Sequence, residues 1–333
     1  MKAERRIAGS QIRCTMPQSL LEYADSLDQR DLRWPAPPKF ELVNATPSLK
    51  PLAGMRGVTW SLYGTLLRIT DGELLLRHPQ ALRMEVAIEK TIQEFNMWNS
   101  MTRRPGKPAD LMLPKYLNLL EEARLTSTSR KGDYPEIDAA QIWRKLLELL
   151  DKKEYRYDES VYGDWNELSQ KVAYFFQTAL QGTEGAQGGL ATLHAISTGG
   201  LRQAALADAQ CFTLVQLTRA LRSQGNVQQL DSILPDSLNT LSYASGIRKP
   251  SKSLYAEALL GFQKIGIEPH QILHISSRIH DDLAIAKSCG MRTVLFAGDK
   301  TSLKVTSAEL KDPAIRPDRL VTELIQLREI LQV

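Results

Sequence analysis

Alternating helix and strand patterns fill the chain from residue 187 to residue 333, and this alternation limits the possible folds more than any other feature of the sequence. The expected strands are short apolar runs at residues 203–206, 271–275 and 293–296. The expected helices carry apolar residues at helical spacing, at residues 190–198, 212–222, 251–265, 278–289 and 318–331. This alternation predicts a mostly parallel sheet with helices on both faces and a functional site at the carboxyl ends of the strands.

A second region, between Pro79 and Leu180, has helical periodicity throughout. The pattern is clearest at residues 137–150, after Pro135-Glu136 as a helix start, and it recurs at residues 81–98, 116–125 and 165–180. An apolar strand precedes this region and the alternating region follows it, so the sequence predicts an all-helical insertion within an α/β domain.

Four short segments fall at the ends of expected strands. In Gly57–Leu67 an apolar run meets the Gly64-Thr65 turn, where glycine lets backbone amides approach an anion closely. The other three segments are Leu206–Gln210, Ser245–Pro250 and His274–Asp282. Because parallel strands end at one edge of a sheet, these four segments are expected to lie together.

In this order the four segments resemble the motifs of the haloacid dehalogenase superfamily, whose first motif is Asp-x-Asp-Gly-Thr-Leu. The resemblance covers roughly residues 55–300. It implies a Rossmann-like α/β core with a helical cap inserted after the first strand. The implied organisation is an N-terminal Pro-rich arm at 1–54, a core at 55–75 and 183–333, and a helical cap at 76–182.

The sequence departs from the family pattern at four central positions. Ser61 and Tyr63 stand where the first motif has its two aspartates, and Ala207 stands where the second has Ser or Thr. Ser277, preceded by Ser276, replaces the aspartate of the fourth motif. In the family the first aspartate attacks phosphorus and ligates magnesium, while the second handles the leaving-group proton, so the resemblance implies degenerate catalysis.

The replacement side chains offer poor substitutes for this chemistry. Serine needs an adjacent base to act as a nucleophile, and the loop around Ser61 has no histidine or carboxylate. A phenol has an ordinary pKa of about 10, so Tyr63 cannot replace an acidic proton donor near neutral pH. We interpret Tyr63 as an aromatic side chain that fills the pocket.

Magnesium prefers carboxylate oxygens, whereas two of the implied ligands are now the hydroxyls of Ser61 and Ser277. Asp282 matches the later acid of the fourth motif, and Asp281 is a second candidate ligand. Two adjacent acids at a helix start are also typical of helix caps. We therefore expect no cofactor, and Mg²⁺ only if the chain is an active hydrolase.

Lys249 falls on the lysine of the third motif, which in the family balances negative charge. With the aspartates replaced, Asp282 becomes its expected partner, either as a structural salt bridge or within an anion site. For the second alternative the candidate phosphate-binding residues are Gly64, Thr65 and Lys249.

The preferred prediction is therefore a catalytically degenerate phosphohydrolase scaffold that binds a phosphorylated small molecule or a protein partner. One alternative is an active hydrolase that activates water through Asp208, Asp281 or Asp282; another is a protein interaction module that uses the arm and the cap. The net charge of +4 is mild and spread, so neither nucleic acid nor membrane is an expected partner. Three unpaired cysteines and the absence of an apolar leader favour a cytoplasmic protein.

Overall fold

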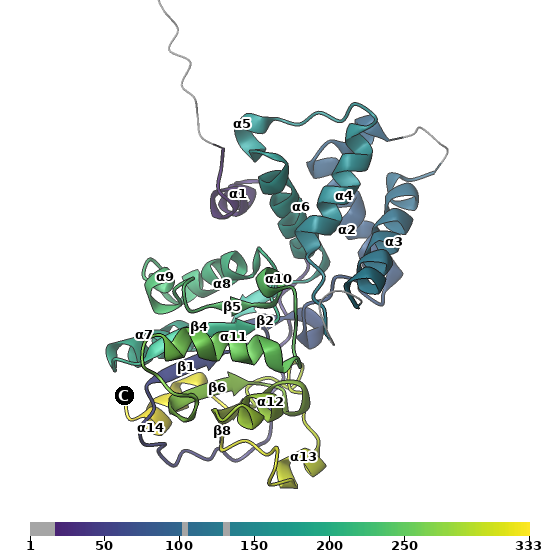
Figure 1. The fold of residues 1–333 in the computed structure, drawn as a ribbon. Coiled ribbons are helices and arrows are strands. Elements are labelled where there is room, and N and C mark those ends of the chain that lie inside the picture. The colour runs from purple at the N-terminus through teal and green to yellow at the C-terminus, as the bar shows by residue number, and fades with distance from the viewer. Residues whose placement is uncertain (1–16, 102–105, 129–133) are drawn as a thin grey trace, which may run out of the picture.

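Six parallel strands form the central sheet of the computed structural model, which describes residues 17–101, 106–128 and 134–333 (Figure 1). Their order across the sheet is β5-β4-β1-β6-β7-β8. The bounds are β1 Gly57–Trp60, β4 Arg202–Ala207, β5 Thr240–Leu241, β6 Ile272–Ser276, β7 Arg292–Phe296 and β8 Arg319–Val321. The predicted α/β fold class with a mostly parallel sheet is confirmed.

Helices cover both faces of this sheet, and the two-residue repeat of the strands explains how. In β4, Ala205 and Ala207 pack into one apolar cluster, while Ala204 and Leu206 pack into another on the opposite face. The first cluster includes residues from α7 Gly189–Thr198, α8 Thr213–Leu221, α9 Leu230–Ile233 and α14 Leu327–Leu331. The second includes residues from α11 Lys252–Gln263 and α12 Ala284–Ser288. Two short helices, α10 Ser242–Ser245 and α13 Ser307–Lys311, lie in the connections.

The helical cap is inserted through a narrow ribbon of two antiparallel strands. Strand β2, Leu67–Ile69, leads out of the core, and β3, Thr183–Gly185, pairs with it where the chain returns. Between them lie α2 Ala81–Glu94, α3 Pro108–Thr128, α4 Ala139–Asp151, α5 Glu159–Tyr162 and α6 Trp165–Leu180. Figure 1 shows these helices as a bundle of their own, set apart from the sheet.

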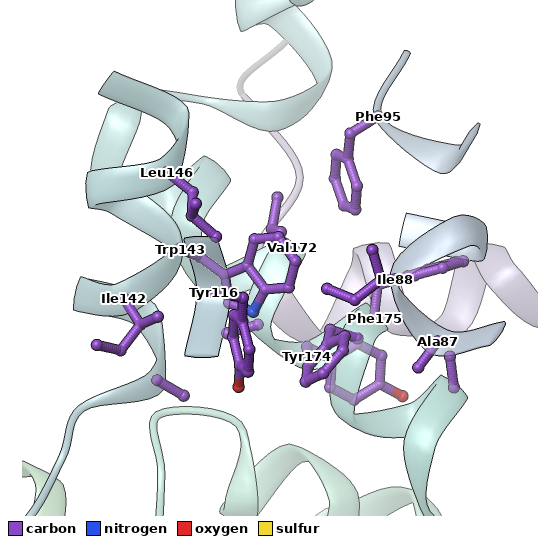
Figure 2. Close-up of a cluster of buried hydrophobic side chains, with 14 of the residues drawn as sticks. Ala87, Ile88, Phe95, Tyr116, Ile142, Trp143, Leu146, Val172, Tyr174 and Phe175 are labelled. Atoms are coloured by element: carbon purple, nitrogen blue, oxygen red, sulfur yellow. The ribbon is translucent and has the colours of Figure 1, made fainter. Parts of the chain in front are cut away.

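The cap has its own aromatic core (Figure 2). The rings of Tyr116, Trp143 and Phe176 lie with their centroids 5.0 to 5.3 Å apart. Helix α4 supplies Trp143 from its apolar face, and it begins at Ala139 because the Asp138 side chain accepts hydrogen bonds from the first-turn amides. Burial of these rings stabilises the helical bundle, whose apolar cluster also includes Phe212 next to α8.

Some sequence-based expectations need correction. The helix predicted at 318–331 is wrong in its first part: Arg319–Val321 is strand β8, which pairs with Val294–Phe296 of β7. The helix expected at 116–125 is the middle of the longer α3. The ribbon of β2 and β3 was not predicted, because its two strands lie on opposite sides of the cap in the sequence. Within the described part of the chain, every helix falls short of the length or apolarity needed to cross a bilayer.

Candidate functional site

Three of the four motif segments follow neighbouring strands, as the sequence predicts. Ser61 follows β1, Ala207 ends β4 and Ser277 follows β6, and these strands are adjacent in the order β4-β1-β6. The fourth segment, with Lys249, follows α10 and is joined to the β4 end because the Lys249 amide donates to Asp208 Oδ1 over 2.9 Å. The fold thus brings the four segments to one edge of the sheet.

The centre of this site is a buried cluster around the Asp282 carboxylate. Lys249 Nζ lies 2.6 Å from Asp282 Oδ2, while Tyr255 OH and His274 Nε2 lie 2.7 and 2.6 Å from Oδ1. The Asp282 side chain is 1% exposed and that of Lys249 4% exposed. The carboxylate that Lys249, Tyr255 and His274 contact is therefore shielded from solvent.

Protonation states follow from these contacts. Burial alone would raise the pKa of Asp282, but the Lys249 charge and the hydrogen bonds from Lys249 and His274 hold it well below its usual range. Burial raises the pKa of Tyr255 well above its usual value, and the Asp282 charge raises it further, so the phenol keeps its proton and donates it. The cluster is an ion pair whose carboxylate also accepts a hydrogen bond from the neutral Tyr255.

His274 extends this cluster into the sheet. Burial lowers the pKa of His274, although Asp282 acts in the opposite direction, and the imidazole is neutral. Since a carboxylate only accepts, Nε2 must carry the proton, and Nδ1 then accepts from Thr59 Oγ1 at 2.8 Å. Thr59 and His274 are register partners on β1 and β6. His274, Thr59 and Tyr255 are not among the site residues predicted from the sequence, although the first two are polar residues inside apolar strands.

Tyr63 is packed into the core, with its hydroxyl directed at α8. The hydroxyl donates to Gln216 Oε1 at 2.7 Å and lies 3.1 Å from Thr213 Oγ1. Burial raises the pKa of Tyr63, and the Thr213 contact opposes this only in part. Tyr63 therefore stays a neutral phenol that joins the loop to α8.

The first-motif loop is held by its own hydrogen bonds. The amide of Gly64 donates to the Leu67 carbonyl at 2.8 Å, and the amide of Thr65 to the Leu62 carbonyl at 3.2 Å. The Thr65 hydroxyl donates to the Ser61 carbonyl. These two amides are thus engaged within the loop, and phosphate binding by Gly64, Thr65 and Lys249 stays a prediction.

Small hydroxyl side chains surround Gly64. A Cβ placed on Gly64 would lie 2.5 Å from Ser277 Oγ and 3.1 Å from Ser302 Cβ, so both serines pack against this glycine. Ser302 Oγ is buried and has no hydrogen-bond partner among the described residues. Among those residues the Ser61 hydroxyl makes no hydrogen bond to a histidine or carboxylate that would activate it.

The donor set does not fit Mg²⁺. Both oxygens of Asp282 already accept from protein donors, and Asp281 is an exposed residue whose carboxylate lies 2.9 Å from His280 Nδ1. Ser61 and Ser277 contribute only hydroxyls where a hard cation prefers carboxylates. No group of three histidine, cysteine or acidic side chains with metal-binding geometry occurs within residues 17–101, 106–128 and 134–333.

The cap reaches this edge of the sheet through the segment before α4. Glu136 Oε2 accepts from Ser242 Oγ at 2.6 Å, and Gln210, the last residue of the second motif segment, bonds both the Ile137 carbonyl and the Ala139 amide. Burial raises the pKa of Glu136 to about 7, and the Ser242 hydrogen bond opposes this shift. The sequence analysis did not single out Glu136 or Gln210.

Comparison with known proteins gives matches of several kinds. A family model described as HAD-hydrolase-like matches residues 246–327. Glyceraldehyde 3-phosphate phosphatase from Pyrococcus furiosus is 32% identical over 92 residues, which are 28% of this chain and 35% of that protein. The chain thus matches about a third of the length of this relative.

Solved structures extend the likeness to the whole fold. The 2-haloacid dehalogenase from Pseudomonas syringae pv. Tomato DC3000 has a TM-score of 0.50 at 17% identity, over 83% of this chain and 97% of that chain. YfnB from Bacillus subtilis, described as a HAD-hydrolase bound to magnesium, has a TM-score of 0.42 at 12% identity, over 84% and 99% of the two chains. Residues 246–327 are thus similar to a HAD-hydrolase-like family model, and the chain shares the fold of the 2-haloacid dehalogenase from Pseudomonas syringae.

Proposed function

We propose that this chain is a haloacid dehalogenase-like protein without the phosphohydrolase chemistry of its relatives, and that it binds a phosphorylated small molecule as a binding or regulatory protein. The observation that carries the proposal is the Asp282 cluster. The carboxylate kept from the motifs is buried, and both of its oxygens already accept from protein donors, Oδ2 from Lys249 and Oδ1 from His274 and Tyr255.

Replacement of the motif aspartates by Ser61 and Ser277 removes negative charge that would repel an anion. Two carboxylates at positions 61 and 277 would repel an anion unless a metal ion neutralised them, whereas two hydroxyls donate hydrogen bonds to it. The Lys249 charge is compensated by Asp282, so the adjacent site keeps little net charge. The unpartnered hydroxyl of Ser302 beside Gly64 adds a further donor. Anion binding of this kind does not require magnesium.

Calorimetric titration with inorganic phosphate tests the binding part of the proposal. We expect the same dissociation constant in EDTA and in excess MgCl₂. Ser277→Ala should weaken binding, while the matched change Ser288→Ala, at an exposed serine on α12, should leave it unchanged. Binding that appears only with Mg²⁺ would contradict the proposal.

The similarity to glyceraldehyde 3-phosphate phosphatase supports a second candidate, an active phosphatase with altered acid residues. Asp208 and Asp281 are its available carboxylates, since Asp282 is engaged. Restoring the family pattern with Ser61→Asp, Tyr63→Asp and Ser277→Asp distinguishes the two. Phosphatase activity gained from none supports the degenerate protein, and loss of an existing activity supports the altered enzyme.

A further inference from the structure

The N-terminal segment contacts the cap through α1, Leu20–Ser26. Tyr23 is buried, with its ring centroid 6.0 to 6.5 Å from those of Phe95, Tyr162 and Tyr174, all in the cap. Its hydroxyl donates to Glu94 on α2 at 3.1 Å. Arg30, just after α1, also pairs with Glu94, with both guanidinium contacts at 2.6 Å. This part of the segment is docked on the cap by apolar and ionic contacts together.

The opposite side of the same segment contacts the core. Asp25 lies 2.6 Å from Arg222 and 3.4 Å from Arg219, and Asp28 forms an ion pair with Arg219. Arg219 lies in the last turn of α8, which packs on the sheet, and Arg222 directly follows that helix. Figure 1 shows α1 beside α6 of the cap. Helix α1 is therefore a bridge with a cap side and a core side.

Further along, the segment crosses the ribbon through which the cap is inserted. Trp34 packs edge-on against Phe175 of α6, with ring centroids 5.2 Å apart. A side chain on Gly182, between α6 and β3, would collide with the Ala36 carbonyl, so the two backbones pass in close contact. Pro38 then accepts from Arg68 of β2 at 3.0 Å. The segment thus lies directly on the two connections between cap and core.

After a last contact of Phe40 with the ribbon, the segment is fixed to the core. The Phe40 ring lies 5.2 Å from the Arg68 guanidinium, and the Glu41 backbone bonds both Asp299 and Lys300. The amides of Ser48 and Leu52 donate to the carbonyls of Leu320 and Ile330, at 2.8 and 2.9 Å. One continuous stretch of chain is therefore attached in turn to the cap, the ribbon and the edge of the sheet.

Cap and core are joined by the two-stranded ribbon, about which a cap can rotate as a hinge, and by the contacts of Glu136 and Ala139 with Ser242 and Gln210. A third attachment with contacts on both bodies opposes such rotation, because the contacts on one side must break before the cap can move. We propose that residues 18–52 form a strap that holds the cap in one fixed orientation over the core. The strap does not depend on the proposed function, since a binding protein and a hydrolase could each carry it.

The distance between two spin labels, one on the cap and one on the core, tests the strap in the full-length chain. Labels at Lys145→Cys on α4 and Gln263→Cys on α11 occupy exposed positions, with the native cysteines replaced by alanine. The test variant is Asp25→Asn with Asp28→Asn, which removes the ionic contacts to α8. The matched control is Glu148→Gln with Asp151→Asn, which removes two exposed ion pairs within the cap region.

We expect one narrow distance distribution for the wild type and the control, and a second distance in the test variant. The population with the second distance should be about tenfold larger in the test variant than in the wild type. Each exposed ion pair contributes little by itself, but the test variant loses three of them together. About 1 M salt, where the Debye length is about 3 Å, should broaden the wild-type distribution. A broad wild-type distribution in low salt, or a folded test variant as narrow as the control, would overturn the strap. If the test variant does not fold, the salt experiment decides, and an unchanged distribution in high salt overturns the strap.

Discussion

Lys249 Nζ lies 2.6 Å from Asp282 Oδ2, and both side chains are buried. This ion pair joins the third and fourth motif segments of a site whose other acidic positions hold Ser61 and Ser277. Its lysine and its acid are the charged motif residues that remain. Their contacts order this part of the site: each charge is paired with the other, and His274 and Tyr255 add hydrogen bonds to the carboxylate.

Lys249→Met should be strongly destabilising, because it leaves the Asp282 carboxylate buried without its counter-charge. We expect a loss of about 3 to 5 kcal/mol in the free energy of unfolding, measured by urea denaturation. Lys252→Met, at an exposed lysine on α11, is the matched control and should change stability by less than about 0.5 kcal/mol. Adding Asp282→Asn to Lys249→Met should restore part of the loss, and a double variant less stable than Lys249→Met would contradict the pairing.

Gly64→Ala should destabilise the first-motif loop for two reasons. Gly64 has a φ of +84°, where an L side chain is strained, and the new Cβ would meet Ser277 Oγ. Gly200 has a φ of +82° but open space around it, so Gly200→Ala measures the backbone strain alone, at about 1 to 2 kcal/mol. Thermal unfolding should show a larger loss for Gly64→Ala, and Ser277→Ala should relieve part of it. Equal losses at the two glycines would contradict the packing of Ser277 against Gly64.

Tyr63→Phe should cost about 1 to 3 kcal/mol of unfolding free energy, because the buried Gln216 side chain loses its donor. Tyr134→Phe removes a hydroxyl from an exposed tyrosine and should be close to neutral. Urea denaturation of both variants and the wild type measures the two changes in unfolding free energy. A neutral Tyr63→Phe would show that the hydroxyl contact with α8 contributes nothing to the loop.

Stability should depend on pH through Glu136. Burial raises its pKa from 4.5 to about 7 in the folded chain, so the folded state binds more protons than the unfolded state between these values. The wild type therefore loses stability as pH rises from about 4.5 to above 7, by about 1.4 kcal/mol for each unit of pKa shift. Glu136→Gln should remove this loss and be the more stable protein at pH values above 7.

Urea melts across this pH range measure the difference between Glu136→Gln and the wild type. The exposed Glu257 on α11 provides the control variant Glu257→Gln, which should follow the wild-type profile. A constant difference between Glu136→Gln and the wild type at all pH values would show that Glu136 does not titrate in this range.

Much of the fold could be predicted because its central strands are apolar runs in a regular alternation with helices. Strand β8 could not be predicted, because Arg319-Leu320-Val321 resembles the start of the helical pattern that follows. It is a strand because it pairs with β7. The β2 and β3 ribbon depends on contacts across the whole cap insertion. The local sequence pattern does not indicate pairing between segments that are so far apart in the chain.

The candidate site divides in the same way. Ser61, Ala207 and Ser277 could be brought together from the sequence because parallel strands end at one edge. Tyr255 could not be predicted as a site residue, because an aromatic residue on the apolar face of a helix is typical of core packing. Glu136 reaches the site from the cap, so its role follows only from tertiary contacts.

The most direct test of the central claim is magnesium-dependent release of phosphate from a panel of phosphomonoesters that includes glyceraldehyde 3-phosphate. The account predicts no release above background by the wild-type chain, with or without Mg²⁺, because Ser61 stands at the nucleophile position and both oxygens of Asp282 already accept from protein donors. Release that requires Mg²⁺ and disappears in Asp282→Asn, with that variant still folded by circular dichroism, would contradict it.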